Sequence, residues 1–143
     1  MTSWRKFFSK KPSVPKKRKI QYERGECQTF YAYVKFHYPD LAGDLERHEC
    51  GGSRGKIERA MLKEEGMKPG FPDYFFYYPS GKFHGLAIEM KKSMRYGGSR
   101  PVTSPEQMER ILRFRKRGYA AYVCEGEEEA VKVFRKYLKQ SEY

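Results

Sequence analysis

The chain has 143 residues and a formal net charge of +12, with 38% hydrophobic and 16% aromatic residues. This length suits one domain with its own core, and the aromatic content excludes a wholly disordered chain. No apolar run approaches the roughly 18–20 residues of a membrane span, so we expect no membrane partner. The three cysteines form no Cys-x-x-Cys pair, which argues against a disulfide framework and a zinc ribbon. We expect an intracellular, reduced protein.

The first predicted segment is a basic arm over residues 1–20, with eight Lys or Arg residues and no acidic residue. Because a Pro- and Lys-rich segment buries little apolar surface, we expect this arm to be disordered. Its positive charge suits sequence-independent binding to nucleic-acid phosphates, with a basic cluster at Lys16, Lys17, Arg18 and Lys19. That cluster also resembles a nuclear-import signal. The expected compartment is intracellular: the cytoplasm, with the nucleus as an alternative in a eukaryotic host.

Residues 21–143 are predicted to form one ordered domain that begins with a helix. The segment from Tyr22 to Tyr38 has apolar residues at helical spacing, and Pro39 closes it. The predicted inward face consists of Cys27, Tyr31, Val34 and Tyr38. After a glycine-rich loop, a short helix is predicted from Ile57 to Glu65, with Gly66 as its C-cap.

The second half of the chain predicts a hairpin, a helix, a strand and a final helix. Two aromatic or apolar runs within 71–93 flank the turn signal Pro79-Ser80-Gly81-Lys82, which is typical of an antiparallel hairpin. A helix follows from Ser104, with a strand over 119–124 after it. The predicted inward residues of that helix are Met108, Ile111 and Leu112, and those of the final helix are Ala130, Val133, Phe134, Tyr137 and Leu138. The order predicts an α/β fold in which the second and third strands are parallel.

The hairpin places two carboxylates and a lysine on apolar strands. If the turn centres near Gly81, Asp73 lies roughly opposite Glu89, with their Cβ atoms about 4.5–5.5 Å apart. Lys91 shares the face of Glu89 because strand side chains alternate. Two carboxylates this close repel each other unless a cation lies between them, and Mg²⁺ prefers such hard oxygen ligands. The alternative is ordinary polar alternation on a solvated strand face.

Four short motifs then occur in the order found in the virus-type replication-repair nuclease domain (VRR-NUC) of the PD-(D/E)xK nuclease superfamily. They are Gly66-Met67-Lys68-Pro69-Gly70-Phe71-Pro72-Asp73, Ile88-Glu89-Met90-Lys91, Ser104-Pro105-Glu106-Gln107 and Gly118-Tyr119. The resemblance covers roughly residues 22–140. It implies a restriction-endonuclease-like αβββαβ-type core, which is a small mixed sheet flanked by helices.

The resemblance also implies roles for individual residues. Asp73, Glu89 and the Met90 carbonyl resemble the ligands of Mg²⁺, for which Mn²⁺ would substitute. Lys91 resembles the catalytic lysine, and Gln107 the glutamine near the site. Gln107 also completes a Ser-x-x-Gln capping box, so it has a structural alternative.

Other parts of the resemblance are less well matched. Glu26 and Glu23 compete for the family's first-helix glutamate, and we favour Glu26. Arg54 follows a Gly-Gly-Ser segment in which Cys50 stands where the family has asparagine. Arg54, Arg95 and Arg100 are candidates for DNA contacts, the alternative being solvated loop residues. Tyr96 is a weaker candidate for stacking on a base.

The predicted function is metal-dependent, structure-selective cleavage of branched DNA, such as four-way (Holliday) junctions, by water attack on the phosphodiester. The resemblance further implies a homodimer, for which Tyr31, Tyr33, Phe36 and Tyr38 could supply an interface. Three alternatives stay open: a nuclease of flaps or linear DNA, a non-catalytic nucleic-acid-binding module, and a small basic structural protein. In the last of these, the acidic pairs would be surface ion pairs.

Overall fold

A computed structural model describes residues 17–48 and 55–140, with side chains from Tyr22 onward. Two predicted DNA contacts, Lys16 and Arg54, lie outside the described residues. The helices and strands follow in this order: α1 (Lys17–His37), the 3-10 turn η2 (Ala42–Asp44), β1 (Leu45–Arg47), α2 (Lys56–Glu64), β2 (Tyr74–Phe76), β3 (Leu86–Lys91), the 3-10 turn η3 (Met94–Tyr96), α3 (Pro105–Lys116), β4 (Ala120–Glu125) and α4 (Gly126–Lys139).

The strands form one mixed sheet in the order β1-β2-β3-β4. β2 and β3 pair antiparallel, and β3 and β4 pair parallel, so the predicted hairpin and the predicted crossover are both confirmed. β1 pairs antiparallel with β2 and was missed as a separate element. Its three residues, of which only Leu45 is apolar, are too few to show strand alternation. The predicted α/β class is confirmed.

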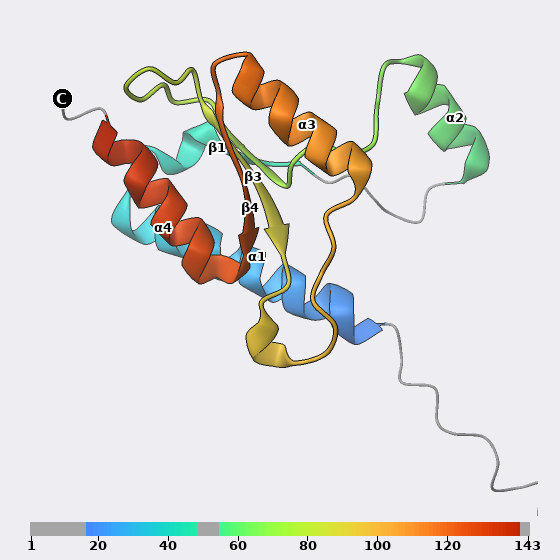
Figure 1. Cartoon of the computed structure of the whole chain (residues 1–143), viewed down its shortest axis with the longest axis horizontal. Helices are drawn as coiled ribbons and strands as arrows, with labels where there is room; N and C mark the ends of the chain where they lie inside the picture. The colour runs from blue at the N-terminus through green and yellow to red at the C-terminus, as the bar shows by residue number, and fades with distance from the viewer. Residues whose placement is uncertain (1–16, 49–54, 141–143) are drawn as a thin grey trace, which may run out of the picture.

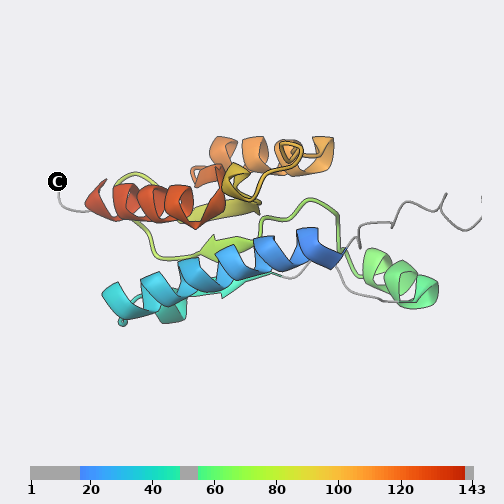
Figure 2. The same cartoon turned by 90° about the horizontal axis from the view of Figure 1, so that it is seen from below.

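Helices cover both faces of the sheet (Figures 1 and 2). The face under α1 and α4 carries the main core, in which large side chains from helices and strands interlock. That core includes Phe30, Tyr74, Phe76, Ile88 and Phe134. The opposite face, under α3, is lined by the small residues Ala87 and Ala121. α4 buries Ala130, Phe134 and Tyr137 as predicted, while Val133 and Leu138 pack at the edge of the core.

The first helix differs from its prediction in its start and in its inward face. α1 begins at Lys17, so the predicted arm boundary at residue 20 falls inside a helix. The buried residues are Glu26, Cys27, Phe30 and Val34, whereas Tyr31 is 38% exposed. The core therefore takes the stripe through Phe30, because this bulky side chain meets Tyr74 and Phe134.

The inward face of α3 also differs from its prediction. Ile111 is buried, but Met108 and Leu112 are 42% and 53% exposed. The second inward residue is Phe114, whose ring lies 5.7 Å from those of Phe71 and Phe75. α3 thus contacts the sheet through Ile111 and Phe114, which pack in one cluster with Ala87, Ala121 and the partly buried Phe75 and Val123.

α2 follows its prediction closely, and Gly66 takes the left-handed conformation of a C-cap, with φ of 100°. Within the described residues, no helix combines the length and the apolar character that crossing a membrane requires.

Candidate active site

Asp73 and Glu89 lie at one end of the sheet in the predicted register. Tyr74 pairs with Ile88, and continuing this antiparallel register places Asp73 opposite Glu89. The Met90 amide donates a hydrogen bond to Asp73 Oδ2 at 2.8 Å, which fixes the carboxylate against β3. The hairpin spacing in the sequence was therefore sufficient to predict this pairing.

Glu89 is a buried carboxylate, 3% exposed. Lys91 Nζ lies 3.2 Å from Glu89 Oε1, and Gln107 Nε2 donates a short hydrogen bond to the same oxygen. Burial, together with the charge of Asp73, raises the pKa of Glu89 to about 7, against the lowering effect of Lys91. The ammonium group of Lys91 thus only partly offsets the free-energy cost of ionising the buried Glu89 carboxylate.

Gln107 makes the hydrogen bonds that both of its considered roles require. As a capping residue, its backbone amide donates to Ser104 Oγ at 3.2 Å, and its Oε1 accepts from the Ser104 amide at 3.0 Å. As a site residue, it accepts from Lys91 Nζ at 2.8 Å through the same Oε1. The helix cap therefore holds the amide group in place between Lys91 and Glu89.

Substitutions can separate the two roles of Gln107. We expect Ser104→Ala to cost about 1 kcal/mol of stability through loss of the cap, and to leave the DNA cleavage predicted from the sequence close to the wild-type rate. Gln107→Ala should lower stability similarly and also reduce activity about 10- to 100-fold, because Lys91 loses its orienting acceptor. Thermal melts and DNA cleavage rates measure the two effects. Equal activity losses in both variants would show that the glutamine acts only as a cap.

Gly70 explains why the loop before Asp73 can approach α3. Its φ of +87° is left-handed, and a Cβ there would lie 2.6 Å from the backbone carbonyl carbon of Glu106. A side chain at this position would therefore collide with the first turn of α3. The glycine of the Gly-Phe-Pro-Asp segment thus brings Asp73 and Gln107 into the same site.

We expect Gly70→Ala to be strongly destabilising. The left-handed conformation alone costs about 1–2 kcal/mol for alanine, and moving the α3 backbone adds to this cost. Gly43→Ala is the matched control, because nothing lies within 4 Å of a Cβ at that position. Chemical denaturation of both variants measures the difference. Equal stability of the two variants would contradict the close approach.

The preference for Glu26 as the first-helix acid is corrected by the structure. Glu26 is 1% exposed and points to the end of β3, where its Oε2 accepts from the Ser93 amide at 3.0 Å. Glu23 instead faces the site: burial raises its pKa, the charge of Asp73 raises it further, and Lys91 lowers it. The two residues are three positions apart on α1, so they lie on the same side of the helix but almost one turn apart, and this offset along the axis gives them different partners.

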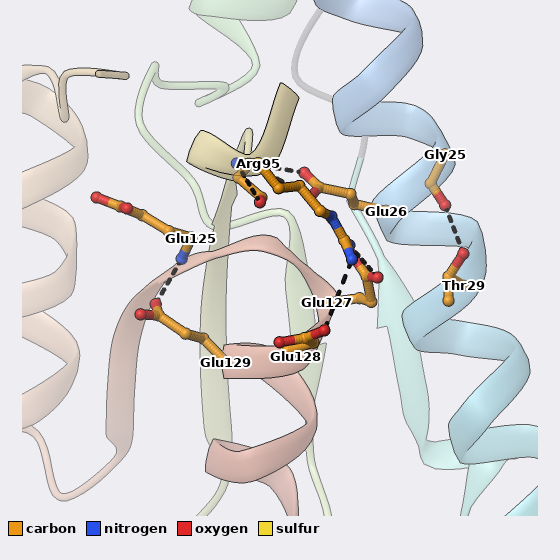
Figure 3. A network of polar contacts seen from close by, with 9 residues as sticks. Gly25, Glu26, Thr29, Arg95, Glu125, Glu127, Glu128 and Glu129 are labelled. Atoms are coloured by element: carbon orange, nitrogen blue, oxygen red, sulfur yellow. Dashed lines mark hydrogen bonds and ion pairs between the residues drawn. The ribbon is translucent and has the colours of Figure 1, made fainter. Parts of the chain in front are cut away.

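Arg95 also has a different environment from the one predicted. Figure 3 shows its side chain between α1 and the first turn of α4, where it pairs with Glu26, Glu127 and Glu128. Tyr96, beside it, stacks on Tyr22 with ring centroids 4.5 Å apart. These contacts hold the loop after β3 against α1 and α4, and the roles of Arg95 and Tyr96 on DNA stay predictions. No local pattern in the sequence indicates these long-range partners.

The remaining predicted DNA contacts are only partly located. Arg100 is 75% exposed and donates through Nε to Glu125 Oε1 at 2.8 Å. Lys17, Arg18 and Lys19 belong to the first turn of α1. Their role on DNA stays a prediction.

Arg47 is a site residue that the sequence analysis missed. Its Nη1 donates to Asp73 Oδ1 at 2.8 Å, and its guanidinium lies 5.3 Å from the centre of the Tyr74 ring. Because β1 is so short, neither the strand nor the pairing of Arg47 with Tyr74 could be read from the sequence. The one feature of the sequence that could have drawn attention to Arg47 is its place in a charged stretch between Glu46 and His48.

The donor set suits a hard divalent cation. Among the described residues, no group of three His, Cys, Asp or Glu side chains is placed to hold a metal ion. Asp73 and Glu89 do lie opposite each other in register, and the charge of Asp73 acts on Glu89. Mg²⁺ is commonly held by one or two carboxylates with water and substrate phosphate. Burial and, second to it, the charge of Asp73 raise the pKa of Glu89, and a cation bound between the two carboxylates would oppose both effects. The residues therefore fit Mg²⁺ or Mn²⁺, and the Met90 carbonyl as a ligand stays a prediction.

No protein-family model and no curated protein matches this chain. Among solved structures, it resembles a protein named "VRR_NUC domain protein", with a TM-score of 0.70 and 28% sequence identity. The similarity covers 84% of this chain and 90% of the other. It supports the predicted restriction-endonuclease-like core for the sheet and helices described above.

Proposed function

We propose that this chain, which resembles a VRR_NUC domain protein over 84% of its length, is a metal-dependent DNA endonuclease. The observation that carries the proposal is the convergence of Asp73, Glu89, Lys91 and Gln107 at one end of the sheet. Each contacts another member through a hydrogen bond or an ion pair, or lies opposite it in register.

The proposed reaction is hydrolysis by direct attack of water. Bound Mg²⁺ or Mn²⁺ would supply Lewis acidity toward the scissile phosphate and its water, held by Asp73 and Glu89. Lys91 lies where it can orient the attacking water and stabilise negative charge on the phosphate oxygens. The new bond joins the water oxygen to phosphorus, and the bond from phosphorus to the 3′ oxygen breaks. The water loses a proton and the leaving oxygen gains one, which gives a 5′-phosphate and a 3′-hydroxyl.

Gln107 and Glu23 have supporting roles in this scheme. Gln107 fixes Lys91 through Oε1 and Glu89 through Nε2. Glu23 adds a third negative charge near Asp73, which further favours a divalent cation there. We propose that Glu23, in place of Glu26, is the first-helix acid of the site.

We further propose that the substrate is branched DNA, with four-way junctions preferred, and that the protein acts as a homodimer. The net charge of +12 supports a polyanionic substrate. Of the aromatic residues considered for the interface, Tyr33 and Tyr38 pack against the core. Phe36 is 80% exposed, so this residue is the best candidate for a contact between two copies.

Comparison of a labelled four-way junction with linear duplex of the same sequence tests this proposal. We expect Mg²⁺-dependent cutting of the junction at symmetric positions and slower cutting of the duplex. Phe36→Ser should lower the molar mass measured by light scattering. Equal cutting of junction and duplex would overturn the junction preference, and binding without cutting would favour a non-catalytic module.

A further inference from the structure

A cleft beside the candidate active site contains basic and aromatic residues that the proposed chemistry does not use. α1 and the edge strand β1, which lie together on one side of the molecule (Figure 2), enclose a volume of about 410 Å³. This volume is within the range of small-ligand pockets, about 300–1,000 Å³. The cleft is therefore large enough for one nucleotide unit.

The wall of the cleft suits a nucleotide in charge and shape. Arg24, Gln28 and Tyr31 line it from α1, and Arg47 lines it from β1. The three α1 residues are spaced i, i+4 and i+7, so they lie along one stripe of the helix. Two guanidinium groups match a phosphate, and an exposed tyrosine ring can stack on a base.

Arg47 connects this cleft to the site of cleavage. One of its N–H groups is used by Asp73, but a guanidinium has five donors in a planar fork. The same side chain can therefore contact a carboxylate and a phosphate together. Because Asp73 would hold the cation at the scissile phosphate, a phosphate on the cleft side of Arg47 would be a neighbour of the one that is cut.

The remaining lining residues favour binding over a second chemistry. The Tyr74 hydroxyl donates to the Cys27 carbonyl at 2.9 Å, and burial raises the pKa of the Cys27 thiol to about 11. Both groups are therefore neutral near pH 7. Among the described residues that line the cleft, Glu46 is the one carboxylate, against the two guanidinium groups of Arg24 and Arg47.

We propose that this cleft is a subsite for the nucleotide adjacent to the scissile phosphate. Arg24 and Arg47 hold the flanking phosphate, and Tyr31 stacks on the base or sugar that accompanies it. The assignment rests on the proposed nuclease function for its substrate, because DNA supplies both the phosphate and the ring. It adds a DNA contact in a cleft between α1 and the edge strand β1, which is not lined by Arg95 or Arg100.

A phosphate-by-phosphate binding experiment tests the subsite. A fluorescent four-way junction is prepared with single neutral methylphosphonates at successive positions, and its affinity is measured by anisotropy in EDTA, so that no cleavage occurs. We expect the wild type to bind the junction more weakly when the methylphosphonate stands at one of one or two consecutive positions. In Arg24→Ala, a methylphosphonate at those positions should not weaken junction binding further. The slope of log affinity against log salt concentration should fall by about one phosphate contact. The control is Arg135→Ala, at an exposed residue of α4, which should retain the wild-type dependence of affinity on methylphosphonate position.

Tyr31→Ala provides a second measurement at an exposed residue, where folding is not at risk. Losing one stacking partner should weaken junction binding about tenfold. The subsite is overturned if Arg24→Ala keeps the wild-type phosphate profile, or if Tyr31→Ala changes only the molar mass. If binding shows the Arg24-dependent phosphate profile but the protein never cuts DNA, the cleft binds DNA and the proposed nuclease function is wrong. If the protein cuts DNA but the profile does not depend on Arg24, the nuclease function stands and the proposed subsite is wrong.

Discussion

Replacement of Lys91 by alanine should reduce cleavage about 10²- to 10³-fold while the protein stays folded. Lys91 is the cation within 3.2 Å of Glu89 and is held by Gln107 at 2.8 Å, so no nearby side chain takes over its position in the described site. Loss of one charge-stabilising group in an active site has an effect of this size. Single-turnover cleavage of a labelled junction in Mg²⁺ measures it.

The control for Lys91→Ala is Lys116→Ala, in the last turn of α3 and exposed to solvent. This variant should cut at the wild-type rate. Lys91→Arg should not restore activity, because the planar guanidinium cannot replace a compact ammonium group between Glu89 and Gln107. Wild-type cleavage by Lys91→Ala would remove this residue from the mechanism.

Glu89→Gln should abolish most cleavage and, in the absence of metal, make the protein more stable at alkaline pH. The pKa of Glu89 is raised from 4.5 to about 7 in the folded state, so folding favours the protonated form. The stability contributed by that proton is fully present below pH 4.5 and is lost as the pH rises through about 7. Glutamine resembles the protonated acid at every pH.

The expected difference between the variant and the wild type is on the order of 2–3 kcal/mol at pH 8 in EDTA, and it should vanish toward pH 4.5. Thermal melts across this pH range measure it, with Glu109→Gln on the exposed side of α3 as control. Added Mg²⁺ should narrow the gap, because it stabilises only the ionised wild-type site. A wild type that is more stable than Glu89→Gln at pH 8 in EDTA would contradict this account of the buried carboxylate.

The core of the site was predictable because it depends on local spacing. One turn signal and two strands fix the register that places Asp73 opposite Glu89. The Ser-Pro-x-Gln motif fixes the start of α3, and the cap itself holds Gln107 toward Lys91. Each of these relations is set within a hairpin or a single helical turn, so the order of residues carries enough information.

The parts that were not predictable depend on contacts between distant segments. β1 has three residues and is recognisable as a strand only through its pairing with β2. The hydrogen bond from Arg47 to Asp73 therefore could not be predicted from the sequence. The choice between Glu23 and Glu26 depends on how α1 is rotated against the sheet. Phe30, a core residue, sets that rotation. The carboxylates that pair with Arg95 lie on α1 and α4, and no local sequence pattern indicates that these segments meet.

The most direct test of the proposed nuclease is the rate of junction cleavage as Mg²⁺ is titrated into the metal-free protein. We expect no cutting in EDTA, a saturable rise with Mg²⁺ and substitution by Mn²⁺. Asp73→Asn should require more metal or fail to cut, because one of the two carboxylates is lost. Cleavage in EDTA, or tight junction binding without cleavage in either metal, would contradict the assignment of Asp73 and Glu89 as the metal-binding pair of a nuclease.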